Sequence, residues 1–263
     1  MGRKQGKIFN VWLNSALKEE VLAYVKYRIK TGKKFCIVTP NPEIVLASTQ
    51  DKKLELALNK ADLALPDGVG LSIAGRFLGL KPLNVLPGRK VFQDLISLAE
   101  KNSWRVFLLG GEADVSGRAA GKLMKKYKKI EFEWADGPRI NKSGLPDTQI
   151  DSMIQKVCVE KINKFKPHLL FIALGPTKQE KWMINNLPHL NVGGAMTVGG
   201  TFNYIAGVSP VPPKWMEKAG LEWGWRLITE PWRIGRIVNA VIIFPWKVFL
   251  YKMSKSTNLQ IYK

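Results

Sequence analysis

The chain has little cysteine and histidine, and each shortage excludes a kind of site. Its two cysteines, Cys36 and Cys158, are too few for a disulfide framework and lack metal-ligand spacing, so we expect buried thiols. Its two histidines, His168 and His189, have no partner serine or cysteine motif, so we expect structural roles. The sequence therefore favours neither a disulfide scaffold nor a histidine-activated nucleophile.

Motifs that handle phosphates through a metal or a dedicated loop are also missing. The chain has no Asp-x-Asp clamp for a metal-bound nucleotide diphosphate, no Gly-Lys-Ser/Thr phosphate loop and no full Gly-x-Gly-x-x-Gly pattern. An enzyme of this sequence that acts on a nucleotide diphosphate would have to stabilise the leaving phosphates with backbone amides, lysine or arginine. We therefore expect a metal-independent enzyme without a cofactor.

Acidic residues are outnumbered by basic ones. Lys and Arg total 41 against 21 Asp and Glu, which gives a formal net charge of +20. Such a field favours an anionic partner, and nucleic acid, anionic lipid headgroups and sugar-nucleotide diphosphates all qualify. The basic start, Met1–Lys7, is followed by a run too short and too polar for a signal peptide, so we expect a cytoplasmic protein.

Short β-rich runs alternate with helical patterns through most of the chain. The predicted strands are Ile8–Leu13, Phe35–Thr39, Leu63–Pro66, Val106–Leu109, Ile130–Trp134, Leu169–Leu174 and Ala195–Val198. This alternation is typical of parallel strands joined by crossover helices, so we predict an α/β fold with a mostly parallel, Rossmann-like sheet. A proline-rich run at 208–213 separates this body, residues 1–207, from a C-terminal helical appendage, residues 208–263.

Polar or glycine-rich loops follow five of the predicted strands. They lie at 39–43, 66–70, 110–112, 175–180 and 199–201. In open α/β sheets, ligands bind beyond the carboxyl ends of the strands, so these loops predict one ligand site. Glycine lets the backbone approach a ligand, and a following helix N-terminus favours phosphate. Lys178, in the first turn of one such helix, is either a phosphate contact or a solvated lysine.

Asp67 is the strongest candidate for chemistry because it stands where a predicted strand ends and a helix begins. One interpretation is a helix cap that accepts hydrogen bonds from the amides of Val69 or Gly70. The other is a general base. In both, the amides and the helix dipole would hold the carboxylate ionised, which makes it available as a base but a weak one.

Tryptophan and arginine interleave in the appendage, between Gly220 and Arg236. This mixture suits a surface that meets lipid-linked phosphates, although a helical hairpin with its tryptophans packed inward is an alternative. The apolar run Ile237–Tyr251 would span about 23 Å as a helix, less than a hydrocarbon core of about 30 Å. Pro245 interrupts it. We expect this segment to lie in the membrane interface and not to cross the bilayer.

Several motifs along nearly the whole chain occur together. They are Thr39-x-Asn41-x-Glu43, Pro66-Asp67-Gly68-Val69-Gly70, Leu108-Leu109-Gly110-Gly111, Gly175-x-x-x-Gln179-Glu180, Val198-Gly199-Gly200-x-Phe202, Ala206-Gly207 and the terminal Gly-Leu-Glu-Trp…Arg-Leu…Glu-Pro-x-Arg…Arg. In this order they resemble the WecG/TagA/CpsF glycosyltransferases. The combination is more specific than any single motif.

The resemblance implies an inverting transfer of a sugar from a UDP-sugar to an undecaprenyl-diphosphate-linked sugar at the cytoplasmic membrane surface. The best-known members use UDP-N-acetylmannosamine and an acceptor that carries N-acetylglucosamine, in teichoic acid and other surface-polysaccharide synthesis. By position, Asp67 is the catalytic base. The implied substrate-binding residues are Thr39, Asn41, Gly110, Gly111, Gly137, Gly175, Lys178 and Gln179, and the implied acceptor-diphosphate contacts are Arg226, Arg233 and Arg236. A homo-oligomer is compatible with this interpretation.

Four positions depart from the family pattern. The family usually has arginine at Val85 and aspartate at Lys90; it often has aspartate at Asn203, and an Arg-Ala-Pro turn starting at Val211. These changes leave UDP-glucose and UDP-glucuronate open as donors, and Arg89 is a candidate to replace the missing charge. A non-catalytic membrane scaffold is also compatible with them. A basic nucleic-acid-binding protein is disfavoured, because no such module is recognisable.

Overall fold

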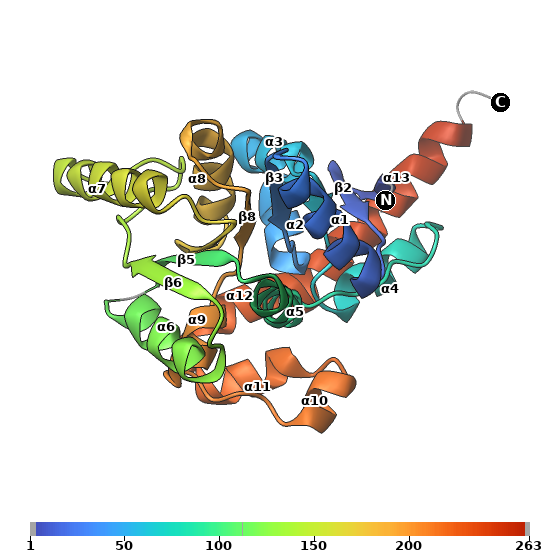
Figure 1. Ribbon diagram of the computed structural model, residues 1–263. Coiled ribbons are helices and arrows are strands. Elements are labelled where there is room, and N and C mark those ends of the chain that lie inside the picture. The colour runs from blue at the N-terminus through green and yellow to red at the C-terminus, as the bar shows by residue number, and fades with distance from the viewer. Residues whose placement is uncertain (1–3, 112, 261–263) are drawn as a thin grey trace.

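The computed structural model describes residues 4–111 and 113–260, and its centre is a six-stranded sheet of order β4-β3-β8-β7-β5-β6 (Figure 1). The strands are β3 (Phe35–Val38), β4 (Leu63–Ala64), β5 (Arg105–Gly110), β6 (Glu131–Ala135), β7 (Leu169–Ala173) and β8 (Gly194–Thr197). All neighbouring pairs are parallel, so the carboxyl ends of the strands share one edge. The predicted α/β class and these six strands are confirmed.

Helices cover both faces of the sheet because its strands are apolar on both sides. One face packs against α1 (Lys18–Lys30), α5 (Gly88–Asn102), α6 (Val115–Lys126) and α9 (Thr201–Ala206). The other packs against α2 (Pro42–Ser48), α3 (Lys52–Lys60), α7 (Gln149–Phe165) and α8 (Lys178–Asn186). Alternate residues of one strand serve the two cores: Val106 and Leu108 face the first, while Phe107 and Leu109 face the second.

The prediction of one strand over Ile8–Leu13 is wrong. The structure has an antiparallel hairpin there, β1 (Lys4–Ile8) and β2 (Val11–Asn14). Phe9 takes the left-handed conformation, with φ of 50°, and the chain turns back at Asn10. The hairpin keeps Ile8 and Val11 in the core, which explains why the apolar pattern looked continuous.

After α9, the part of the chain that the structure describes contains only helices. They are α10 (Lys214–Lys218), α11 (Glu222–Thr229), a 3-10 turn (Pro231–Arg233), α12 (Ile234–Val238), a π-helical turn (Asn239–Ile243) and α13 (Phe244–Gln260). The segment Pro231–Ser254 is one helical stretch of 24 residues, which we call the long helix. By length and composition alone it could cross a membrane.

The expectation that Pro245 interrupts the apolar segment is therefore wrong. The π-helical turn lies immediately before it, and the Phe244 N–H donates to the Asn239 carbonyl, five residues back. A proline in a regular helix clashes with the carbonyl four residues earlier, and a widened turn relieves that clash. At about 1.5 Å per residue the long helix is about 36 Å, not the 23 Å expected for a shorter segment.

One face of the long helix packs on the body. Phe244 and Val248 are 1% and 2% exposed, and the Phe244 and Tyr251 rings lie 5.9 and 5.3 Å from the Phe9 ring. Between Gly220 and Arg236, Trp223 and Trp232 are instead 41% and 75% exposed. The alternative with inward tryptophans is wrong for these two side chains.

Candidate active site

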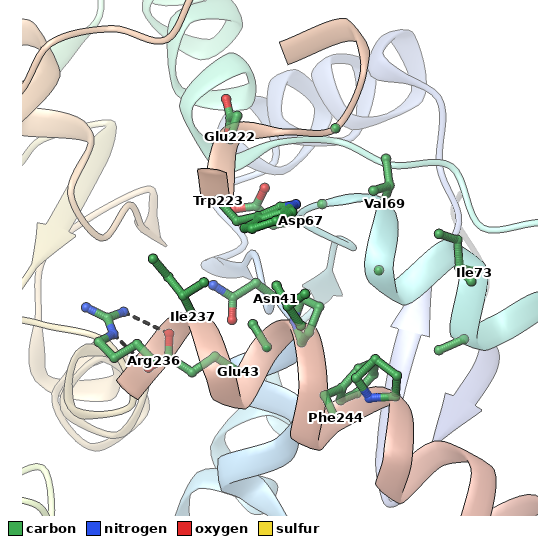
Figure 2. A pocket seen from close by; sticks show the side chains of 18 of the residues that line it. Asn41, Glu43, Asp67, Val69, Ile73, Glu222, Trp223, Arg236, Ile237 and Phe244 are labelled. Carbon is green, nitrogen blue, oxygen red and sulfur yellow. Dashed lines mark hydrogen bonds and ion pairs between the residues drawn. The ribbon is translucent and has the colours of Figure 1, made fainter. Parts of the chain in front are cut away.

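A pocket of about 620 Å³ lies where the loops after β3 and β4 meet α11 and the long helix. Figure 2 shows Asp67 and Asn41 near its centre, with Arg236 and Glu43 on one side and Ile73 and Phe244 on the other. Of the predicted site residues, it brings together Asn41, Asp67, Arg226, Arg233 and Arg236. The volume falls within the roughly 300–1,000 Å³ typical of ligand sites.

Asp67 is held by the backbone around it and does not cap a helix. Its N–H donates to the Pro40 carbonyl at 2.9 Å, and its carboxylate accepts from the Gly88 N–H. The helix α4 (Val69–Phe77) has Gly68 as its N-cap, with no side-chain cap bond. Since the cap position belongs to Gly68, the Asp67 carboxylate is available to the pocket, and the cap interpretation is wrong.

Thr39 packs on the backbone segment that contacts Asp67. A side-chain carbon added at Gly88 would lie 2.6 Å from Thr39 Oγ1, so the threonine packs directly on the Gly88 backbone. That backbone supplies the N–H to Asp67. Thr39 does not line the pocket itself. It therefore contacts Gly88, and through Gly88 it can act on Asp67, but it does not face the pocket.

The pKa of Asp67 is raised to about 7, contrary to the expectation of a carboxylate held ionised by amides. Burial is the largest cause, and the Glu222 carboxylate on α11 adds to it. Three groups lower the pKa but do not offset burial and Glu222: Arg226, the Gly88 N–H and Arg89. A carboxyl group with this pKa can take up a proton near neutral pH, as a general base must.

The three predicted arginines differ in their partners. Arg236 makes a bidentate contact with Glu43, with Nε–Oε1 2.7 Å and Nη2–Oε2 3.0 Å, and Arg233 is paired with Glu230, which is 6% exposed. Within the described residues Arg226 makes no ion pair, and its guanidinium lies over the Tyr204 ring at 5.4 Å. Of these three arginines, Arg226 is therefore the one that is least engaged by carboxylates.

Arg89, the candidate replacement for the missing family charge, reaches the appendage. It forms an ion pair with Glu217 and lies 3.2 Å from Glu222, while its guanidinium stacks over Tyr204 at 5.3 Å. Arg89 therefore ties α5 to α11, next to the carboxylate that acts on Asp67. Val85 is partly buried and Lys90 is exposed, with its Nζ 3.8 Å from Glu217.

The predicted glycines lie at the same sheet edge but outside this pocket. Gly110 has φ of 96°, and a side-chain carbon there would lie 2.6 Å from the Ala173 carbonyl oxygen, so packing alone requires glycine. A side-chain carbon added at Gly137, where φ is 79°, would lie 2.9 Å from Leu174 Cδ2 and 3.5 Å from the Gly110 Cα. Gly175, with φ of 87°, faces open space. The loop after β7, with the partly buried Lys178 beside it, is therefore the more accessible ligand surface.

Gln179 is buried and does not point at a ligand. Its side chain is 3% exposed; Nε2 donates to Glu180 Oε1 at 2.8 Å, and Oε1 accepts from the Gly199 N–H at 3.2 Å. It therefore joins the loops after β7 and β8. Across residues 4–111 and 113–260 there is no group of three His, Cys, Asp or Glu side chains that could hold a metal ion.

Comparison with known proteins identifies the family. Residues 6–258 match the model of the glycosyl transferase WecG/TagA/CpsF family. The chain belongs to this family of glycosyltransferases. The resemblance inferred from the motifs is thereby confirmed.

Among its relatives is the N-acetylglucosaminyldiphosphoundecaprenol N-acetyl-beta-D-mannosaminyltransferase of Bacillus subtilis (strain 168). It is 30% identical over 229 residues, 87% of this chain and 84% of the relative. The enzyme of the same name from Staphylococcus aureus (strain MRSA252) is 31% identical over 221 residues, 84% of this chain and 80% of the relative.

Sequence reasoning missed the roles of Glu222 and Tyr204. Glu222 stands in the Gly-Leu-Glu-Trp motif, but nothing in that motif shows that it lies beside Asp67. Tyr204 carries no motif signal, yet its ring lies under the guanidinium groups of both Arg89 and Arg226. Both are consequences of contacts between the appendage and the body.

Proposed function

We propose that this glycosyltransferase moves N-acetylmannosamine from a UDP donor to N-acetylglucosamine on a polyprenyl diphosphate, with inversion. The observation that carries the proposal is the Asp67 carboxyl, with a pKa of about 7, in a pocket shared with three arginines. The relatives' names supply the sugar and the acceptor, and their β-linked product is the one expected from inversion of an α-linked donor.

In the proposed reaction, Asp67 takes the proton of the acceptor hydroxyl as its oxygen attacks the anomeric carbon. The new oxygen–carbon bond forms on the face opposite the nucleotide, the bond from that carbon to the UDP oxygen breaks, and UDP leaves with the electron pair. Asp67 must be ionised beforehand, so a pKa of about 7 balances the ionised fraction against proton affinity near neutral pH.

Two regions of the site suit the two diphosphates, one of the acceptor and one of UDP. We assign the acceptor diphosphate to Arg226, because it faces the pocket and makes no ion pair within the described part of the chain. We assign the UDP to the loops after β7 and β8, where Gly175, Gly199 and Gly200 face open space. The start of α8 and Lys178 would add to its stabilisation without a metal.

We further propose that the protein lies on the cytoplasmic face of the membrane, with the long helix in the plane of the interface. Its exposed side carries Ile242, Trp246 and Leu250, which are 62%, 59% and 47% exposed. Phe244 and Val248, near its middle, are buried on the body. A helix with its centre packed on the body fits an interfacial position better than a span.

The test is UDP release by the purified full chain with N-acetylglucosaminyl-diphospho-prenyl acceptor and a panel of UDP-sugars. UDP-N-acetylmannosamine should give the highest kcat/KM, and the product linkage should be β. A preference for UDP-glucose or UDP-glucuronate would overturn the donor assignment and keep the transferase. UDP release that does not need the acceptor would overturn the proposed reaction.

A further inference from the structure

The part of the pocket between α4 and the long helix has apolar walls, so it offers no hydrogen-bonding groups to a sugar. α4 supplies one wall and the long helix the other. The side chains concerned are Ile73, Ala74, Phe77, Val241, Phe244 and Phe249, with Val248 below them. We call this part of the pocket the apolar groove. Figure 2 shows Ile73 and Phe244 on its two sides, away from the Arg236–Glu43 pair.

Both walls of the apolar groove leave large side chains open to solvent. Ile73 is 64% exposed, Phe77 41% and Phe249 43%, whereas Phe244 and Val248, which anchor the long helix on the body, are buried. An apolar surface of this kind, in a pocket rimmed by polar residues, is typical of a ligand-binding groove. At about 1.5 Å per residue, α4 runs about 12 Å from Val69, beside the Asp67 turn, to Phe77 at the far end.

A cation lies at each end of the apolar groove, but the two cations are engaged differently. At the inner end, Arg226 is close enough to act on the Asp67 carboxyl, and Asn41 lines the same region. At the far end, the Phe77 and Phe249 rings lie 6.4 Å apart, and the Lys252 ammonium is held by Phe77, donating to its carbonyl at 2.7 Å and lying 4.2 Å from its ring centre. A ligand that fits is therefore anionic at one end of its chain and apolar along the rest.

We propose that the apolar groove binds the first isoprene units of the acceptor's lipid chain. The inference rests on the proposed function, since a sugar–diphosphate–prenyl molecule has its anion between the sugar and an apolar chain. With the chain between α4 and the long helix, the diphosphate lies by Arg226 and the sugar by Asp67. The apolar groove thus selects for prenyl acceptors and sets the depth to which they enter.

The chain offers a matched control for this inference. Ile242 lies on the long helix and is 62% exposed, like Ile73, but it does not line the pocket. Both positions tolerate serine in the fold because both side chains are mostly in solvent. Ile73→Ser should weaken binding of a prenyl chain, and Ile242→Ser should not.

The experiment is calorimetric titration of the full chain with farnesyl diphosphate, geranyl diphosphate and inorganic diphosphate, below the micellar concentration of each. Neither prenyl probe carries a sugar, so binding is measured whether or not transfer occurs. We expect the affinity to rise at least tenfold from inorganic diphosphate to farnesyl diphosphate, with geranyl diphosphate between them and a negative heat-capacity change.

Ile73→Ser should lower farnesyl diphosphate affinity about fivefold and leave inorganic diphosphate unchanged. Arg226→Ala should weaken all three ligands. Equal affinity for the three ligands, or an equal loss in Ile73→Ser and Ile242→Ser, would overturn the inference. If farnesyl diphosphate binds as expected but no UDP-sugar is used, the proposed function fails and the apolar groove remains a prenyl diphosphate site.

Discussion

Asp67→Asn should change how the stability of the protein depends on pH. The pKa of Asp67 is raised from 3.8 to about 7 in the folded chain, mainly by burial. In the unfolded chain it returns to about 3.9. The folded state therefore holds the proton more tightly, and the contribution of Asp67 to stability is fully present below about pH 4 and is lost as the pH rises through 7. The asparagine side chain does not titrate in this range, so the unfolding free energy of the variant should not show this fall with pH.

The size of the effect follows from the shift. One pKa unit corresponds to about 1.4 kcal/mol, so a shift of about three units costs the wild type at most about 4 kcal/mol above pH 7. About 3 kcal/mol of this loss in unfolding free energy occurs between pH 5 and pH 8. The measurement is urea unfolding of the wild type and of Asp67→Asn across this interval, in the same detergent. Relative to the wild type, Asp67→Asn should gain stability by about this amount across the interval.

Asp114→Asn is the matched control. The Asp114 side chain is 76% exposed, and its removal should leave the pH dependence of stability as in the wild type. If Asp67→Asn and the wild type lose the same free energy between pH 5 and pH 8, the raised pKa of Asp67 is refuted. A steeper loss in the variant would refute even its direction.

Three further predictions concern the arginines, the metal and the long helix. Arg226→Ala should raise the acceptor KM by about tenfold or more, and by more than Arg233→Ala or Arg236→Ala, whose guanidiniums are already paired with Glu230 and Glu43. Equal effects in the three variants would contradict the assignment of Arg226. Transfer should survive exhaustive EDTA treatment, and a complete loss restored by Mg²⁺ or Mn²⁺ would show that a metal is needed. Phe244→Ala should cost about 3–5 kcal/mol of unfolding free energy, because Phe244 is 1% exposed, whereas Trp246→Ala should cost much less. Equal small costs in urea unfolding would mean that the long helix does not pack on the body.

The sheet could be predicted because its strands are buried on both faces. Runs such as Phe35–Val38 and Leu169–Ala173 are apolar throughout, and glycine or polar residues mark where they end. The hairpin at Phe9–Asn10 was missed because its turn contains no glycine or proline and its apolar pattern continues across it. Local pattern therefore located the buried strands but not the turn.

The candidate site was predictable in position but not in electrostatics. Asp67 follows a strand, so its place at the carboxyl edge follows from topology. Its raised pKa depends on burial and on Glu222, which the appendage brings from far along the chain. The partners Glu43 and Glu230 neutralise two of the predicted arginines through the same long-range packing. Pro245 shows the reverse case, where a local rule predicted a break that the π-helical turn removes.

The most direct test of the central claim is the pH dependence of single-turnover sugar transfer by the wild type and Asp67→Asn. If Asp67 is the general base, the wild-type rate rises about tenfold per pH unit below pH 7 and levels off above it, following the pKa of about 7. Asp67→Asn should be slower by about 10²-fold or more and should lack this rise. A wild-type rate independent of pH between 5 and 8, or a variant that transfers sugar at the wild-type rate, would contradict the account.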